Sequence, residues 1–147
     1  MKKITIILIA ILLVILVIAL INNISISSKS GLETKESSAG SVSVAVMPRS
    51  LEESSATWDF EIKLNTHSEE LSEDLVIVSE LVDDQGRVHK PISWEGDPPG
   101  GHHRQGVLKF KPILPRPKSI ELKMSKLSAS EIKNAGGISE RIFKWIF

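Results

Sequence analysis

A strict two-residue alternation over 58–65 constrains the fold more than any other feature of the sequence. Large apolar side chains there alternate with charged or amide side chains. A period of two puts successive side chains on opposite faces of a β-strand, whereas a helix would mix both kinds on every face. Burial of each apolar member contributes about 1.5–3 kcal/mol. The apolar members are Trp58, Phe60, Ile62 and Leu64.

The same period recurs along the chain and predicts an all-β domain. Further strands are expected at 42–47, 75–82, 87–94, 107–113, 120–124 and 141–147. Pro48 is expected to end the first of them, and 83–86 has the composition of a hairpin turn. One short helix is expected to open at 128–131. About seven strands of this kind predict an antiparallel, immunoglobulin-like β-sandwich.

The N-terminal end predicts a membrane anchor. After Lys2 and Lys3, residues 4–21 are apolar except for Thr5. Roughly 18 residues of helix measure about 27 Å, close to the hydrocarbon thickness of a bilayer. The lysines favour an N-terminus on the cytoplasmic side, which places the rest of the chain outside. The run exceeds the usual apolar length of a cleaved signal peptide, so an uncleaved signal-anchor over 1–24 is expected. Secretion after cleavage near Ser25 or Ser27 is the alternative.

Composition defines the other segments and excludes several classes of function. Residues 25–41 are mostly small, polar or charged, which predicts a flexible linker before a domain at 42–147. Acidic and basic residues balance at 18 each, so nucleic acid is not an expected partner. The chain has no cysteine, which excludes disulfides, thiolate ligands, cysteine nucleophiles and a lipoprotein anchor.

Three segments carry a resemblance to a group of known proteins. They are DFEIKLNTHSEEL, WEGDPPGGHHRQGVLKF and ERIFKW. Their THS, W-x-G…GGHHR-x-G-x-L-x-F and R-x-F-x-W patterns look like those of small exported or membrane-anchored β-proteins of bacteria and archaea, and they span most of 58–145. The resemblance implies a sandwich fold and no particular activity.

Three histidines form the candidate site. His67 closes one predicted strand, and His102 and His103 precede another. Strand ends gather at the poles of a sandwich, and imidazole is the commonest side-chain ligand of zinc and copper. The sequence therefore predicts a zinc or copper site, with Asp74, Glu95 or Asp97 as a possible oxygen ligand. The competing interpretation is that these histidines hold turns by hydrogen bonds, because adjacent residues of a strand point to opposite faces.

Glycines, arginines and tryptophans around the histidines are expected to shape the structure. Gly100, Gly101 and Gly106 are expected to permit positive φ or close packing. A phosphate cradle is disfavoured because no helix follows them. Arg104 and Arg141 are expected to lie over Trp94 and Trp145 as cation–π pairs, or, for Arg141, to pair with Asp59 or Glu61. The tryptophans are expected to anchor the core.

These features favour a binding or structural module over an enzyme. No serine lies in a G-x-S-x-G elbow, and the acidic residues near 69–74 have the composition of a solvated face. We therefore expect a membrane-tethered module whose candidate partner is another envelope protein. A zinc- or copper-binding protein is the alternative.

Overall fold

The computed structural model describes residues 32–127 and 140–147. The predicted signal-anchor, the first part of the predicted linker and the helix expected at 128–131 lie outside the described residues. Residues Gly31–Phe147 form one compact unit. Within the described ranges, no helix has the length and apolar character needed to cross a bilayer.

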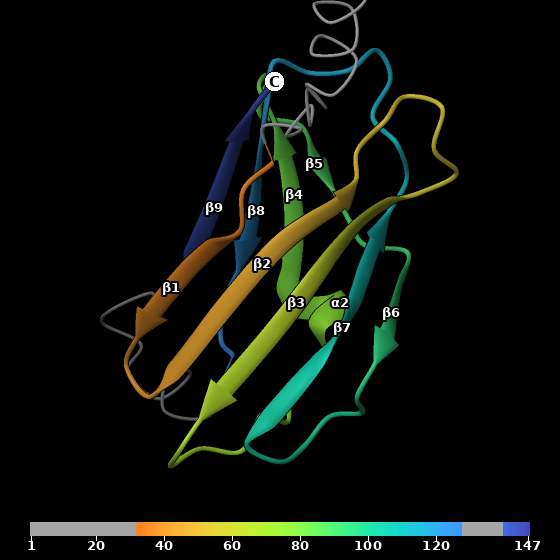
Figure 1. Ribbon diagram of the computed structural model, residues 1–147. Coiled ribbons are helices and arrows are strands. Elements are labelled where there is room, and N and C mark those ends of the chain that lie inside the picture. The colour runs from red at the N-terminus through yellow and green to blue at the C-terminus, as the bar shows by residue number, and fades with distance from the viewer. Residues whose placement is uncertain (1–31, 128–139) are drawn as a thin grey trace, which may run out of the picture. The chain divides into compact units, whose positions relative to one another are not determined.

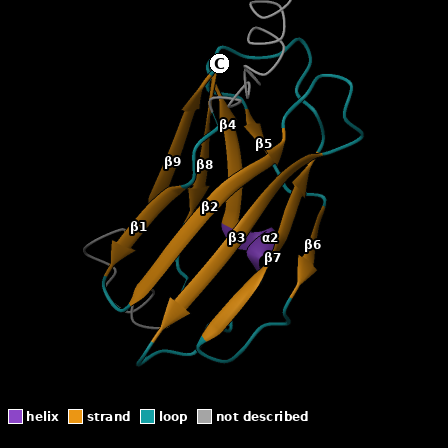
Figure 2. Ribbon diagram, in the orientation of Figure 1, coloured by secondary structure: helices purple, strands orange, loops and turns teal. Residues whose placement is uncertain are grey.

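The described residues form two antiparallel sheets (Figure 1). Nine strands and one helical turn are present: β1 Lys35–Ala39, β2 Val42–Ser50, β3 Trp58–Thr66, α2 Leu75–Val78, β4 Ser79–Asp83, β5 Val88–His89, β6 Ser93–Gly96, β7 His103–Phe110, β8 Ser119–Met124 and β9 Arg141–Ile146. One sheet has the order β1-β2-β3-β7-β6 and the other β5-β4-β8-β9. Figure 2 shows how completely strands dominate this part of the chain. The prediction of an all-β antiparallel sandwich is confirmed, with nine strands in place of about seven.

The core lies between the two sheets and is built on the alternation of β3. Its apolar side chains are at most 1% exposed, whereas the alternate residues lie on the outer face. Aromatic rings from both sheets meet there. The centroid of Phe60 lies 5.6 Å from those of Phe110 and Trp145. The predicted strands at 120–124 and 141–147 supply the opposite face of this core.

The apolar run at 75–82 does not form one strand, and that prediction is wrong in its first half. Leu75–Val78 is the helical turn α2, and only the second half is the strand β4. The Asp74 carboxylate caps the turn by accepting a hydrogen bond from Val76 N at 2.9 Å. The turn buries Leu75 and leaves Ile77 72% exposed, so the apolar composition did not reflect a strand buried on both faces.

The predicted strand at 87–94 is also corrected, because the chain changes sheets within it. β5 pairs with β4 in the four-stranded sheet, and β6 pairs with β7 in the five-stranded sheet. Pro91 lies between them. Proline has no N–H to donate to a ladder, so it is suited to the connection.

Two predictions at the start of the domain are wrong. Residues 35–39, assigned to the linker, form the edge strand β1, so the domain begins before Val42. Pro48 does not end β2, which continues to Ser50 with a shift in register. Pairing of β2 with β1 stops at Val46, so proline occurs where β2 has no neighbour on that side.

The β4–β5 hairpin is organised by a buried carboxylate at the predicted turn. Asp83 Oδ1 accepts hydrogen bonds from the backbone N of Gln85 and of Arg87, each at 2.9 Å. Its Oδ2 accepts from Arg87 Nε at 2.6 Å and lies 3.2 Å from His89 Nε2. Burial raises the pKa of Asp83, but these hydrogen bonds lower it more, so the pKa lies well below its usual 3.8.

We predict that Asp83→Asn lowers the free energy of unfolding by about 1–3 kcal/mol at neutral pH, because the charged acceptor of Arg87 is lost. A carboxyl group whose pKa is lower in the folded than in the unfolded state stabilises the fold at pH values above its unfolded-state pKa. This stabilisation is lost as the pH falls from there toward the folded-state pKa. The difference between wild type and Asp83→Asn should therefore shrink as the pH falls below 3.8, as measured by urea unfolding across pH. Asp84→Asn, in the same turn, is the control, because its exposed carboxylate accepts one hydrogen bond, from Lys118 N at 3.0 Å, which the amide oxygen of asparagine can also accept. An equal loss in both variants would contradict this role.

Candidate functional site

Two loops at one end of the sandwich are bonded into a single unit, which we call the histidine loop pair (residues 67–74 and 97–102). The backbone N of Thr66 donates to His102 O at 2.9 Å, and that of Leu71 donates to Gly101 O at 3.0 Å. Gly100 N donates back to Leu71 O at 2.8 Å. The loops meet because they flank β3 and β7, which are antiparallel neighbours.

Gly100 and Gly101 give the second loop its path. Their φ angles are +117° and +73°, in the region that disfavours side chains with a Cβ. This conformation directs the loop carbonyls toward the first loop. The backbone conformation therefore requires glycine at both positions.

Arg104 holds the loop pair from the inward face of the five-stranded sheet. It lies on the inward face of β7 and is 2% exposed. Its Nη1 donates to Leu71 O at 3.0 Å and to Glu73 O at 2.7 Å. Burial lowers the pKa of Arg104, and the nearby carboxylates of Asp74 and Asp97 partly offset this effect. A buried cation thus holds the first loop against the sheet.

Trp94 occupies the space that two facing glycines leave open. Gly96 and Gly106 are register partners on β6 and β7, and a Cβ on Gly106 would lie 2.7 Å from Trp94 Cζ2 and 2.6 Å from Gly96 Cα. The guanidinium carbon of Arg104 lies 5.8 Å from the centroid of the Trp94 ring, in the cation–π arrangement expected from the sequence. Trp94 Nε1 donates to Asp97 O at 2.8 Å, which joins the ring to the second loop.

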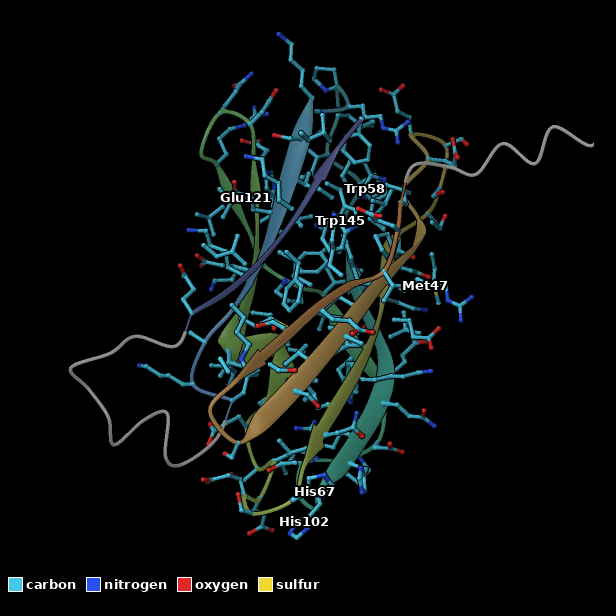
Figure 3. The ribbon with its side chains drawn as sticks, turned by 60° about the vertical axis from the view of Figure 1, so that its left-hand side comes forward. Met47, Trp58, His67, His102, Glu121 and Trp145 are labelled. Carbon is cyan, nitrogen blue, oxygen red and sulfur yellow. The ribbon has the colours of Figure 1, made fainter. Side chains whose placement is uncertain are left out.

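The three histidines are exposed at this end, but they do not form a cluster. His67 and His102 lie together at the end of the sandwich in Figure 3, and neither imidazole has a hydrogen-bond partner among the described residues. His103 is on the outer face of β7, where its Nδ1 lies 2.8 Å from Asn65 Oδ1. No group of three or more potential ligand side chains in 32–127 and 140–147 is placed to hold a metal. The zinc or copper site stays a prediction.

The carboxylates expected to assist the histidines have other contacts. Asp74 caps α2. Glu95 forms an ion pair with Lys109 at 2.8 Å. Asp97 Oδ2 accepts from Gln105 N at 2.8 Å, which extends the β6–β7 pairing into the loop. Each carboxylate therefore stabilises local structure.

A polar depression of about 250 Å³ lies next to the loop pair on the outer face of the five-stranded sheet. It is lined by Lys63, Asn65, Asp97, His103, Arg104 and Gln105. Lys63, Asn65 and Gln105 were not identified from sequence. The only signal available was their position as the polar members of alternating strands, which every outward-facing residue shares.

Arg141 and Trp145 lie on the other side of the sandwich and contact the first strand. Arg141 is 2% exposed and donates to the carbonyls of the β1–β2 hairpin, not to Asp59 or Glu61. Trp145 is 2% exposed and donates from Nε1 to Glu33 O at 2.9 Å. The pairing of Arg141 with those acidic residues is therefore corrected.

The similarity of this chain to known proteins is low. No protein-family model matches the chain, and no curated protein sequence matches it. The solved structure of MPT63, a secreted protein from Mycobacterium tuberculosis, is similar, with 14% sequence identity and a TM-score of 0.41. The match covers 63% of this chain and 83% of that chain. A likeness at this level assigns no function, and the resemblance drawn from the THS, GGHHR and R-x-F-x-W segments stays a prediction.

We predict that Arg104→Met destabilises residues 31–147 by about 2–4 kcal/mol, because two loop carbonyls lose a charged donor. Amide hydrogen exchange should rise most at Leu71, Gly100 and Thr66. Arg49→Met is the control, since Arg49 is an exposed partner of Glu61 and such pairs contribute about 1 kcal/mol or less. Unchanged protection of the loop pair in Arg104→Met would contradict the role of the buried cation.

We also predict that Gly106→Ala costs about 1–3 kcal/mol, since the new methyl group overlaps Glu95 O, Gly96 and Trp94. Thermal unfolding measures the loss, and near-ultraviolet circular dichroism should report a displaced Trp94. Val107→Ala, at the next position and facing outward, is the matched control. A Gly106→Ala protein as stable as this control would show that the close packing is not required.

Proposed function

We propose that the chain is a membrane-tethered, immunoglobulin-like binding module that acts outside the cell membrane. The histidine loop pair and the adjoining polar depression form its contact surface, and another envelope protein is the partner. The surface contains exposed imidazoles, a lysine and side-chain amides, so it suits a polar partner. This function requires no chemical step by the module itself.

The observation that carries this proposal is the contrast between rigid loops and uncommitted side chains. The loop pair is fixed by backbone hydrogen bonds, two positive-φ glycines and a buried arginine. In contrast, the imidazoles of His67 and His102 have no hydrogen-bond partner within the described residues. Loops held rigidly on a scaffold are where binding residues concentrate in many folds. Rigidity also reduces the entropy lost on binding.

The tether is supported by the sequence. Residues 4–21 have the length and apolar character of a membrane span.

A metal-binding function is the second candidate, and the proximity of two histidines favours it. The hydrogen bond from Thr66 N to His102 O brings the backbones of the two histidine-bearing segments together. Zinc or copper would need at least one ligand besides these imidazoles. Rotation of an exposed side chain of the loop pair, such as Glu70, could supply it.

We predict that a photo-crosslinking amino acid at His67 or His102 of the full-length chain, in its native membrane, captures one discrete protein. The same amino acid at Glu121, on the outer face of the other sheet, should capture much less of that protein. Crosslinking confined to position 121 would contradict the proposal.

Titration with Zn²⁺ and Cu²⁺ separates the two candidates. Residues 31–147, stripped with chelator, should bind neither ion tightly if the loops recognise a protein. Stoichiometric binding that is lost in His67→Ala/His102→Ala, but retained in His89→Ala, would instead establish the metal site. His89 lies on β5 in the other sheet and serves as the matched histidine control.

A further inference from the structure

β1 is held at the edge of the sandwich by two side chains from the opposite sheet. Arg141 Nη1 donates to Ser37 O at 3.2 Å and to Val42 O at 2.8 Å, and its Nη2 donates to Ala39 O at 2.8 Å. Trp145 Nε1 donates to Glu33 O at 2.9 Å. Figure 1 shows β1 and β9 along the same side of the two layers. The R-x-F-x-W segment thus places two donors, four residues apart, against the β1–β2 hairpin and the residues just before β1.

These contacts do not depend on the side chains of β1. Every acceptor is a backbone carbonyl, and no residue of β1 is buried, whereas Val42, Val44 and Val46 of β2 are at most 2% exposed. β1 also pairs with β2 through the backbone over five register positions. Any extended segment that presents carbonyls at the same spacing could make the same hydrogen bonds.

The position occupied by β1 would be unfavourable in free energy if no strand filled it. If β1 left it, the β2 edge would expose unpaired N–H and C=O groups over Val42–Val46, and such an edge pairs readily with another chain. Arg141 would lose the carbonyl acceptors at Ser37 and Ala39 while its guanidinium stays near the core, which costs several times the net value of an ordinary hydrogen bond. Occupancy by an extended strand is therefore strongly favoured, whichever molecule supplies the strand.

We propose that the β2 edge together with Arg141 and Trp145 is a strand-acceptor site, and that its second occupant is β1 of another copy of this chain. An identical strand fits the same register without new side-chain contacts, which is why exchange of identical elements is a low-cost route to dimers. The hinge is the two-residue connection Gly40–Ser41 between register partners Ala39 and Val42. Gly40, at φ +60°, forms the tight turn, and a glycine adopts an extended path equally well.

Tethering to a membrane would raise the local concentration of copies and so favour exchange. The exchange itself does not require a tether or a bound partner. It can therefore be tested on residues 31–147, which form one compact unit with its own core, and its failure would leave the proposed binding function untouched.

The absence of cysteine from the chain permits a direct test. Ser38 and Ser43 are register partners on β1 and β2. In Ser38→Cys/Ser43→Cys, a disulfide formed by a mild thiol oxidant links residues of one molecule when β1 is bound in its own copy. After exchange, the same pair links two molecules. Non-reducing electrophoresis and intact mass distinguish the two products.

We expect the covalent dimer to increase several-fold when the protein is concentrated and warmed toward its unfolding transition before oxidation. Lys123→Cys/Ile142→Cys is the matched control, because these register partners on β8 and β9 lie outside the hinge and report only random collisions. A dimer yield no greater than that of the control, or monomer alone at every concentration, would overturn the proposal.

A second variant tests the acceptor site itself. Trp145→Phe keeps the aromatic ring in the core and removes only the donor to Glu33 O. We expect amide protection to fall in β1 and along the β2 edge, and exchange to reach equilibrium several-fold faster than in the parent cysteine pair. An unchanged rate of dimer formation with lost β1 protection would contradict the idea that this strand is what the two copies exchange.

Discussion

Donation from buried side chains to loop carbonyls is the interaction on which the rest of this structure depends. Each of the three tryptophans donates its indole N–H to a backbone carbonyl outside the core, at Glu52, Asp97 and Glu33 respectively. The buried Arg104 does the same at the histidine loop pair, and the buried Arg141 donates to carbonyls of the β1–β2 hairpin. Irregular segments cannot pair their carbonyls in a ladder, and an unpaired buried carbonyl is costly. Large inward-facing side chains with polar ends therefore fix the loops to the sheets.

This arrangement explains why one end of the sandwich is rigid while its side chains remain uncommitted. At the histidine loop pair, the backbone supplies the hydrogen bonds and Arg104 supplies the charge, so His67 and His102 are left to solvent. The outer face of the four-stranded sheet is different in character. It carries ion pairs such as that of Glu121 and Lys144, at 2.9 Å, and it also exposes the apolar side chains of Ile142 and Ile146.

The position of β1 depends on the same kind of interaction. β1 is held by hydrogen bonds to its backbone and not by burial of its side chains, which distinguishes it from β2 and β3. Strands anchored through apolar side chains are specified by their own sequence, whereas β1 is specified by the residues that receive it. Arg141 and Trp145 thus help to hold β1 as the edge strand beside β2.

Local chemistry by itself determined the strands that bury one face. The strands Trp58–Thr66, Ser119–Met124 and Arg141–Ile146 could be predicted from their alternation of apolar and polar residues. A period of two places all the apolar side chains on one face only in a β-strand. The positive φ of Gly100 and Gly101 could likewise be predicted, since glycine adopts that conformation without steric cost.

Only the tertiary structure decided features that depend on a distant partner. Leu75–Val78 is helical because Asp74 caps it and the turn directs Leu75 into the core, although its composition suits a strand equally. Lys35–Ala39 is a strand because β2 and β9 receive its backbone, although its own residues predict a linker. The sequence also could not predict which carbonyls accept hydrogen bonds from Arg104 and Arg141, or which residues line the polar depression. Contacts between residues far apart in the chain leave no periodic trace in either segment alone.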